Sequence, residues 1–352
     1  MNVLVIGGTG RIGPYVLREL LSRSHAVTIV HRGQHPLPLG LDVREVLVDR
    51  RDAVRFVDLM RQERPDVVVD LFPGRAEDTQ AVVEAFRGRI RTSVHVSAFD
   101  VYEQYIAVDV FGAWAPDKDY RHQLAARPIP IREEAPLRAQ HFYPHPQVVA
   151  GFDKVFVERA ISEARARGDF PATILRLAAI YGPAGYSRDD PRLREWYIVK
   201  RALDGRSRIA IPDGGRGIHH RVHYANAAHA VVLAVESPRA VGQAFNVGDT
   251  ELLTVRQLVD RVAAHIGHTW EVVSVPHASM RGWYTLDADP PLILDLTKIR
   301  LLLGYQDVQA AAEGLNETVE YLVRTRPGAR HVTLDYAAED ALIDRALACS
   351  GS

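Results

Sequence analysis

The sequence predicts an α/β fold built on a doubly wound parallel sheet, and two observations carry this prediction. A glycine-rich turn over residues 7–13 joins the apolar run 3–6 to a helical pattern over 15–21, which is the order of a strand, a tight turn and a helix. Further short apolar runs recur along the chain with helical patterns between them. Because strands without polar alternation that are separated by helices are typical of parallel sheets, we expect helices on both faces.

The first strand, turn and helix predict a dinucleotide-binding site. Gly7 lets the chain turn sharply, Gly10 lets backbone N–H groups approach a phosphate without a Cβ in the way, and Gly13 lets the helix pack closely on the strand. The N-terminus of the helix then offers N–H donors and a partial positive charge to a pyrophosphate. The candidate cofactor residues of this turn are Gly7, Thr9, Gly10, Arg11, Ile12 and Gly13.

The residues after the second expected strand, His31-Arg32-Gly33, bear on the choice of cofactor. A site for NAD usually places a carboxylate there to bind the ribose 2′-hydroxyl, whereas a 2′-phosphate calls for a cation. Since Arg32 is present and a carboxylate is not, we expect NADP(H), with NAD as the alternative. His31 and Arg32 are candidate cofactor residues, although a solvated arginine at a strand end would give the same pattern.

Asp49 and Arg50 follow the third expected strand and are also candidate cofactor residues. Asp49 is placed to accept a hydrogen bond from the adenine amino group. It is equally well placed as the N-cap of the helical run 53–60, because aspartate is a preferred residue at that position.

The order of the remaining elements predicts two interleaved domains. The expected strands of the sheet lie at 3–6, 27–30, 46–48, 67–69, 93–96 and 173–175. After about residue 183 helical patterns over 193–203 and 255–266 are mixed with short strands such as 209–211. We expect a dinucleotide-binding domain over 1–182, with 224–248 returning to it, a smaller α+β substrate domain over 183–223 and 249–327, and a C-terminal extension over 328–352.

Composition excludes several classes of protein. The 352 residues carry a formal net charge of −1, which gives no reason to expect nucleic acid or an anionic membrane as a partner. No apolar run approaches the length of a membrane span, and the first strand leaves no room for a signal peptide, so we expect a cytoplasmic protein. The single cysteine, Cys349, excludes an intrachain disulfide and a thiolate metal site.

These motifs, taken in order, resemble the extended short-chain dehydrogenase/reductase superfamily of epimerases and dehydratases. The resemblance covers nearly the whole chain and includes residues 96–102, 153–158, 175–183, 245–248 and 295–305. It implies that Lys154 holds the nicotinamide ribose and that Phe72, Gly74, Ser97 and Tyr181 also lie at the cofactor. It further implies general acid/base catalysis beside a hydride carrier.

The chain departs from this superfamily at the catalytic residues. The position of the usual tyrosine, four residues before Lys154, falls on Ala150, and the position of the usual serine falls on Ala98, with Ser97 one residue earlier. The departure resembles an atypical bacterial subgroup and the chloroplast stem-loop RNA-binding proteins. A long aromatic segment between Ala98 and Ala150 is expected to form a lid, in which His141 and Tyr143 either replace the missing acid or only pack.

The candidate substrate residues are Ala98, Tyr102, Trp196 and Arg221, and amphipathic packing explains Trp196 equally well. His219, His220 and His223 lack a nearby carboxylate and a spacing that suits one face, so we expect no metal. Two functions stay open. The first is an NADP(H)-dependent oxidoreductase or epimerase that acts on a small hydroxy, keto or sugar-like substrate. The second is a catalytically inactive nucleotide-binding sensor, scaffold or RNA-binding protein. The resemblance also implies a homodimer.

Overall fold

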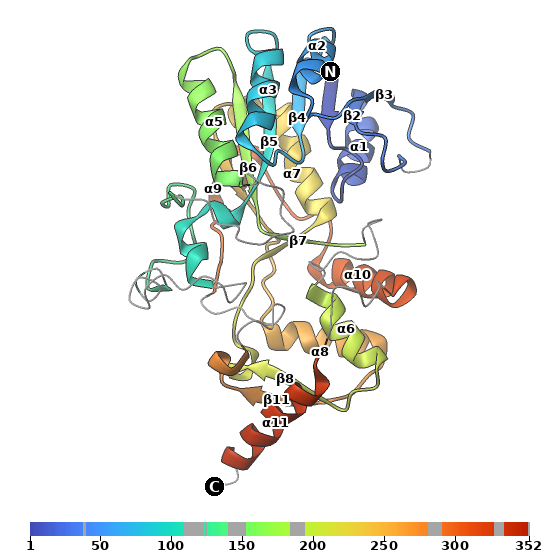
Figure 1. Cartoon of the computed structure of the whole chain (residues 1–352), viewed down its shortest axis with the longest axis vertical. Helices are drawn as coiled ribbons and strands as arrows, with labels where there is room; N and C mark the ends of the chain where they lie inside the picture. Colours follow the sequence, from blue (N-terminus) through green and yellow to red (C-terminus); the bar gives the residue numbers. More distant parts are fainter. Residues whose placement is uncertain are drawn as a thin grey trace.

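The structure is a computed structural model that describes residues 1–37, 40–108, 123, 125–139, 153–183, 194–280, 291–326 and 334–350. A seven-stranded sheet forms the upper part of the molecule in Figure 1, and its strands run parallel in the order β10-β6-β5-β4-β1-β2-β3. They are β1 (Asn2–Ile6), β2 (Ala26–His31), β3 (Arg44–Leu47), β4 (Val67–Asp70), β5 (Thr92–Ala98), β6 (Ala172–Leu177) and β10 (Ala244–Val247). The predicted fold class is confirmed, and every strand expected for the sheet takes part in it.

Helices cover both faces of the sheet because successive strand residues point to opposite sides and both sides are apolar. One face carries α2 (Ala53–Met60), α3 (Ala76–Phe86) and α5 (Lys154–Ala166), and the other carries α1 (Gly13–Ser22) and α7 (Tyr224–Glu236). In β1, Leu4 and Ile6 pack in the core on the side of α2, α3 and α5, whereas Val3 and Val5 pack in the core on the side of α1 and α7. Because all four side chains are buried, each contributes about 1.5–3 kcal/mol to stability.

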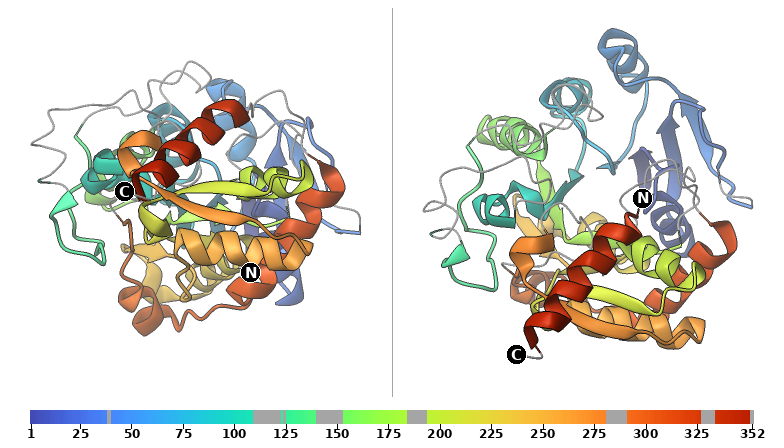
Figure 2. Two further views of the ribbon diagram at one scale, coloured as in Figure 1. Left: turned by 90° about the horizontal axis from the view of Figure 1, so that it is seen from below. Right: turned by 60° about the horizontal axis from the view of Figure 1, so that its bottom comes forward.

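A smaller lobe with its own hydrophobic core lies below the sheet in Figure 1 and comes forward in the right-hand view of Figure 2. It is built from α6 (Arg194–Leu203), β8 (Arg208–Pro212), α8 (Val255–Ile266), β11 (Glu271–Val275), α10 (Ala311–Thr325) and α11 (Tyr336–Ser350). β8 pairs with β11 in parallel, and Ile209, Val259, Leu315 and Ile343 meet in the core. The C-terminal helix α11 is therefore packed on this lobe.

The chain passes between the two lobes at a pair of short strands. β7 (Ala179–Tyr181) pairs with β9 (Arg221–His223), and α9 (Thr297–Leu303), which we expected in the substrate domain, packs against β10 of the large sheet. Short 3-10 helices lie at η1 (Phe99–Val101), η2 (Glu103–Val108), η3 (Asp213–Gly215), η4 (Pro238–Ala240) and η5 (His277–Met280). Gly182 has φ +148°, and a Cβ there would lie 2.3 Å from the Tyr224 ring, so only glycine fits this exit from β7.

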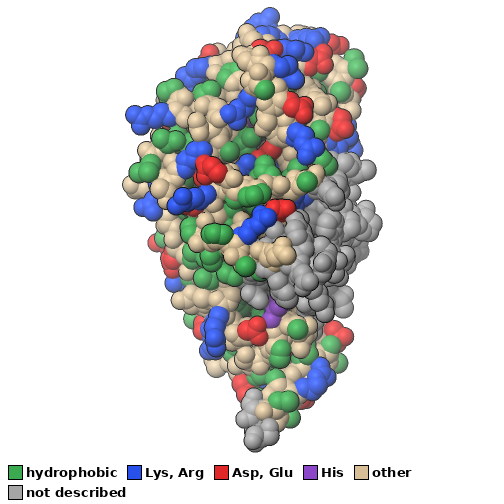
Figure 3. Space-filling view, turned by 90° about the vertical axis from the view of Figure 1, so that its left-hand side faces the viewer, with side chains coloured by type: hydrophobic (Ala, Val, Ile, Leu, Met, Phe, Trp, Pro, Cys, Tyr) green, Lys and Arg blue, Asp and Glu red, His purple; other side chains and the backbone are tan. Residues whose placement is uncertain are grey.

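The surface mixes charges of both signs. On the face shown in Figure 3, Lys and Arg side chains are interspersed with Asp and Glu, in agreement with the formal net charge of −1. No helix in the part of the chain that the structure describes is long and apolar enough to cross a membrane.

Candidate cofactor and active site

The glycine turn lies at the carboxyl end of β1, between β1 and α1. Gly7 has φ +83°, and its N–H donates to Val30 O, which fixes the sharp turn. A Cβ on Gly13 would lie 2.1 Å from Gly8 O, so the close approach of the helix to the turn requires glycine. Ile12 is the N-cap of α1, and its side chain makes no capping hydrogen bond. The N–H groups of Gly13 and Tyr15 donate within the turn, to Gly10 O and Ile12 O, both at 3.1 Å, and Pro14 has no N–H. What the start of α1 offers to an anion is therefore the positive end of the helix dipole, with no capping side chain in front of it.

Thr9 and Arg11 lie half-buried in the same turn. Ile12 is buried in the core beneath it. The turn residues that the sequence singled out are thus brought together, and the fit to a pyrophosphate rests on the helix dipole and on the absent Cβ atoms.

The end of β2 presents Arg32 to solvent. His31 is buried, its Nε2 lies 2.7 Å from Glu45 Oε2, and its Nδ1 accepts a hydrogen bond from Gly33 N at 3.3 Å. Since Nδ1 is the acceptor, Nε2 carries the proton that it donates to Glu45. His31 therefore shapes the turn, and the exposed Arg32 is the side chain that a ligand can reach.

Asp49 is held by Arg51. Its carboxylate accepts hydrogen bonds from Arg51 Nη2 at 2.6 Å and from Arg51 N at 3.0 Å. The hydrogen bond from the Arg51 side chain lowers the pKa of Asp49 to about 2, and the positive charge of Arg32 lies close enough to contribute. The N-cap of α2 is Asp52, which accepts from Arg55 N, so the interpretation of Asp49 as this cap is wrong. α2 begins at Ala53, as the sequence predicts, and the cap is the residue directly before it.

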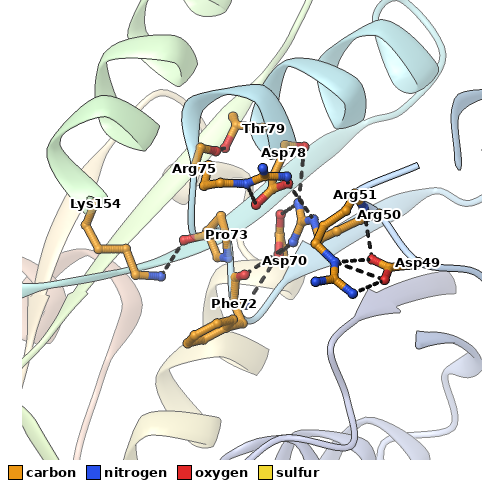
Figure 4. A network of polar contacts seen from close by, with 10 residues as sticks. All are labelled: Asp49, Arg50, Arg51, Asp70, Phe72, Pro73, Arg75, Asp78, Thr79 and Lys154. Atoms are coloured by element: carbon orange, nitrogen blue, oxygen red, sulfur yellow. Dashed lines mark hydrogen bonds and ion pairs between the residues drawn. The ribbon is translucent and has the colours of Figure 1, made fainter. Parts of the chain in front are cut away.

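Arg50 points away from Asp49 and into the protein (Figure 4). Its Nη2 and Nη1 donate to Asp70 at 2.7 and 2.9 Å, and the carbonyls of Phe72 and Asp78 accept at 3.3 and 3.1 Å. Burial alone would raise the pKa of Asp70, but the charge and hydrogen bonds of Arg50 outweigh burial and hold it below the ordinary value. Arg50 therefore braces the end of β4, and this assignment needs long-range partners that sequence spacing does not reveal.

Lys154 is buried at the carboxyl ends of β4 and β5 (Figure 4). Its Nζ donates to Pro73 O at 2.7 Å and to Val96 O at 3.0 Å, and it lies 5.2 Å from the ring centroid of Phe72. Burial lowers the pKa of Lys154 to about 8, although the nearby Asp70 opposes the shift. Phe72 itself is 57% exposed, so part of its side chain is in contact with solvent at this edge.

The start of α5 is fixed by a buried ion pair. Asp153 caps the helix by accepting from Val155 N, and its own N–H donates to Gly74 O at 3.0 Å. Arg138 binds the same carboxylate through both Nη atoms, at 2.9 and 3.1 Å. Gly74, a candidate cofactor residue, is therefore buried against the residue that precedes Lys154.

Ser97 and Tyr102 point inward. The Ser97 hydroxyl donates to Glu158, which forms an ion pair with Arg176 at 2.7 Å. Arg176 donates to the Tyr102 hydroxyl, which in turn donates to Asn246 Oδ1 at 2.6 Å. Tyr102 is fully buried, so in this conformation it offers no surface to a substrate. The predicted serine and tyrosine therefore join a packed network, and its partners come from three other elements.

On the side of the second lobe, the polar groups are also paired. Tyr181 donates its hydroxyl to Asp249 at 2.8 Å, and Arg221 forms an ion pair with Glu195 at 2.7 Å while its guanidinium lies 4.5 Å from the Tyr181 ring centroid. Trp196 belongs to the core of the second lobe. Ala98 is half-buried at the end of β5. Sequence reasoning missed Glu195 and Asp249, because Glu195 comes from α6 and Asp249 follows β10, and only the folded chain brings these elements to Arg221 and Tyr181.

The three neighbouring histidines serve separate contacts. His220 Nδ1 accepts from Leu294 N and His223 Nδ1 accepts from Ala225 N, while the ring of His219 packs edge-on against Phe99. Within the described ranges no group of His, Cys, Asp or Glu is arranged to hold a metal ion. The predicted lid residues His141 and Tyr143 lie outside the described residues.

Known proteins resemble this chain over most of its length. A sequence profile of the NAD dependent epimerase/dehydratase family matches residues 3–98 and 122–248. The chain is 26% identical to 2′-dehydrokanamycin reductase of Streptomyces kanamyceticus over 78% of this chain and 70% of that protein. It is 28% identical to 3-diazoavenalumate denitrifying reductase of a Streptomyces species over 76% of this chain and 82% of that protein.

Among solved structures, UDP-glucose 4-epimerase of Thermotoga maritima with UDP-glucose matches with a TM-score of 0.69 at 20% identity, covering 93% of this chain and all of that chain. At 20% identity, the similarity to this structure shows a shared fold and nothing about the substrate. The profile match covers more than half of the chain, and the expectation of an enzyme that uses a nicotinamide nucleotide agrees with the family and with the reductases above. The chain belongs to the NAD-dependent epimerase/dehydratase family.

Proposed function

We propose that this chain is an NADP(H)-dependent reductase of a small ketone that is not a sugar nucleotide. The observation that carries the proposal is the order of groups along one edge of the sheet. Arg32 and Arg51 lie after β2 and β3, the glycine turn lies after β1, and Lys154 lies at the ends of β4 and β5. This order suits a 2′-phosphate, a pyrophosphate and a nicotinamide ribose in turn.

The chain's own residues fit such a cofactor. The close approach at Gly13 and the uncapped start of α1 suit the pyrophosphate, and the guanidinium of Arg32 can bind a phosphate through two parallel hydrogen bonds. Asp49 is neutralised by Arg51, which favours a phosphate over a bare hydroxyl at the adenosine end. When bound, the reduced nicotinamide would supply a hydride to the carbonyl carbon of the substrate.

The basic side chains near the second lobe support a ketone that carries no diphosphate, because they are paired with carboxylates or neutral. Arg221 is paired with Glu195 and Arg201 with Glu339, and both guanidinium groups are buried. His220 and His223 are neutral at pH 7 because burial lowers each pKa to about 4. These four side chains therefore offer little positive charge to a diphosphate. The two reductases that the chain resembles support reduction as the reaction.

The test is oxidation of NADPH followed at 340 nm with three probes, namely a β-keto ester, an aliphatic α-diketone and UDP-4-keto-glucose. We expect turnover of at least one of the first two probes and slower turnover of the sugar nucleotide. Faster turnover of the sugar nucleotide would contradict the substrate class. Absence of turnover with all three would contradict the reductase assignment. The cytoplasmic location and the homodimer stay predictions.

A further inference from the structure

The residues directly after β3 and directly before α3 include three arginines, which make different contacts. Arg50 donates to Asp70 and to two backbone carbonyls, and its side chain is 15% exposed. Arg75 donates to Asp78 through Nη2 at 2.6 Å and through Nε at 3.3 Å, and its side chain is 25% exposed. The side chain of Arg51 is 57% exposed. Of these three cations, Arg51 is therefore the one that a ligand from solvent reaches most readily.

Asp49 binds Arg51 along one edge of its guanidinium group, at the end of the network in Figure 4 that lies away from Lys154. Arg51 Nε lies 3.1 Å from Asp49 Oδ1 and 3.0 Å from Oδ2, and Arg51 Nη2 lies 2.6 Å from Oδ2. A guanidinium group has five N–H bonds in one plane, and those of Nη1 lie on the edge opposite to Nε. Arg51 can therefore bind a second anion through Nη1 and Nη2 while Asp49 keeps the first edge.

The same contacts limit what Asp49 can do for a nucleotide. A carboxylate accepts about four hydrogen bonds, and Arg51 supplies three side-chain contacts and one from its backbone N–H, which donates to Oδ1 at 3.0 Å. The Arg51 side chain lowers the pKa of Asp49 to about 2, so the carboxylate is charged at neutral pH. A hydrogen bond from the adenine amino group to Asp49 would have to displace one of the bonds from Arg51.

Arg32 lies close to this pair because β2 and β3 are neighbours. The two strands pair in register up to His31 and Leu47, so the turns that follow them begin side by side. The positive charge of Arg32 is near enough to lower the pKa of Asp49. Arg32, Asp49 and Arg51 together carry two positive charges and one negative charge at neutral pH. These two neighbouring turns therefore present a net positive charge on exposed side chains.

We propose that Arg51 is a specificity-determining residue that binds the 2′-phosphate of NADP(H) together with Arg32, while Asp49 holds the other edge of its guanidinium group. This inference rests on the proposed use of NADP(H). A phosphate monoester carries a charge of about −1.5 to −2 near neutral pH, and guanidinium groups bind it through charge-assisted hydrogen bonds. NADH has a hydroxyl group at this place, so the contact distinguishes the two cofactors. No covalent bond forms or breaks in this step.

The first experiment is a calorimetric titration of the nucleotide-free protein with NADPH and NADH, for wild type, Arg51→Ala and Arg256→Ala. Arg256 is the matched control, because its Nε also lies within 2.9 Å of both oxygens of one aspartate, Asp260, and its side chain is 49% exposed, in the second lobe. We expect Arg51→Ala to weaken NADPH binding by about 10- to 100-fold and to leave NADH binding within about threefold of wild type. Unchanged NADPH binding, or equal losses for both nucleotides, would overturn the proposal.

The double variant Asp49→Asn/Arg51→Ala separates contact with the phosphate from neutralisation of Asp49. It removes one charge of each sign, so the net charge of Arg32, Asp49 and Arg51 stays the same as in wild type. We expect its preference for NADPH over NADH to remain about 10-fold or more below that of wild type, because the contact is lost. A return of the preference to the wild-type value would overturn the proposal, since Arg51 would then only neutralise Asp49.

Adenosine 2′,5′-bisphosphate and adenosine 5′-monophosphate repeat the comparison without a nicotinamide. We expect Arg51→Ala to weaken the bisphosphate by about the same factor as NADPH and to leave the monophosphate within about threefold of wild type. Unchanged binding of the bisphosphate would overturn the proposal, because Arg51 would then not contact the 2′-phosphate.

These titrations also separate this inference from the proposed function. They need no turnover, so a wild-type protein that binds NADPH through Arg51 but reduces none of the ketone probes would count against the reductase alone. A preference of the wild-type protein for NADPH that Arg51→Ala retains would overturn this inference and leave the proposed cofactor in place. Tighter binding of NADH than of NADPH by the wild-type protein would contradict both.

Discussion

The two glycines that bracket the first turn constrain it in different ways. Gly7 is needed for its positive φ, whereas Gly13 is needed because the helix backbone approaches Gly8 O too closely for any side chain. The same motif that identifies the cofactor site therefore also fixes the packing of α1 on β1.

Replacing Gly13 by Ala tests this packing. Its Cβ would lie 2.1 Å from a backbone oxygen, so α1 has to move away from the turn. We expect loss of NADPH binding by calorimetry and destabilisation of several kcal/mol in urea. Gly88→Ala is the control, because its Cβ has no neighbour within 4 Å and only the positive φ of +66° costs about 1–2 kcal/mol. Equal effects of the two variants would contradict the close approach.

His95 makes a second prediction at the residue scale. Burial lowers its pKa to about 4 from an ordinary value of 6.5, so the unfolded chain binds a proton that the folded chain does not. The stability that His95 contributes is therefore complete above pH 6.5 and is lost as the pH falls toward 4. When the pH is lowered from 7 to 4.5, the free energy of unfolding of His95→Asn, measured in urea, should fall by about 2 kcal/mol less than that of the wild-type protein. A pH-independent difference between the two proteins would show that His95 is not buried and neutral.

The residues that sequence could and could not predict differ in the range of their contacts. Gly7, Gly13 and Arg32 act through the backbone or at a strand end, and their local pattern indicates where they lie. Ser97 and Tyr102 were expected at the ligand, yet their hydroxyls bind Glu158 and Asn246, which are 61 and 144 residues away in sequence. Only the strand order of the folded sheet brings such groups together.

At the scale of elements, the sequence predicted six of the seven strands of the large sheet, β8 and α8, but it did not predict β7, β9, β10 or β11 and left α11 without a role. Its composition gives no clear apolar stripe, and its attachment depends on charges supplied by α6 and β8. Glu339 is fully buried, and its carboxylate accepts from Arg201 Nε at 3.0 Å and from Ala210 N at 3.1 Å. The C-terminal helix is thus fastened to α6, whose Glu195 reaches the ion pair beside Tyr181.

Glu339→Ala should therefore destabilise the protein by about 3–5 kcal/mol, because it leaves the Arg201 guanidinium buried without this carboxylate. Asp344→Ala removes an ion pair with Arg208 on the same helix, but that aspartate side chain is 66% exposed, and we expect a loss of about 0–1 kcal/mol. Urea unfolding measures both changes. A small loss for Glu339→Ala would mean that α11 contributes little to the fold.

At the scale of the whole molecule, the cofactor edge of the large sheet faces the second lobe. β7 and β9 cross between the two lobes, and Tyr181, Arg221 and Asp249 are paired there. A ligand bound at the large sheet would therefore contact residues of both lobes. Folds of this kind serve many substrates because the function depends on the residues of the site and not on the fold alone. The family match supports a nucleotide cofactor, whereas its proposed place follows from the strand order and its proposed 2′-phosphate from Arg32, Asp49 and Arg51.

The most direct test of the account is a calorimetric titration of the nucleotide-free protein with NADPH and NADH, repeated for Arg32→Ala and for the exposed Arg300→Ala as control. We expect wild type and the control to bind NADPH more tightly than NADH. Arg32→Ala should weaken NADPH binding by about 10- to 100-fold, since charge-assisted hydrogen bonds contribute about 1.5–3 kcal/mol, and should leave NADH binding unchanged. Tighter binding of NADH by the wild-type protein, or equal binding of NADPH by wild type and Arg32→Ala, would contradict the proposed cofactor.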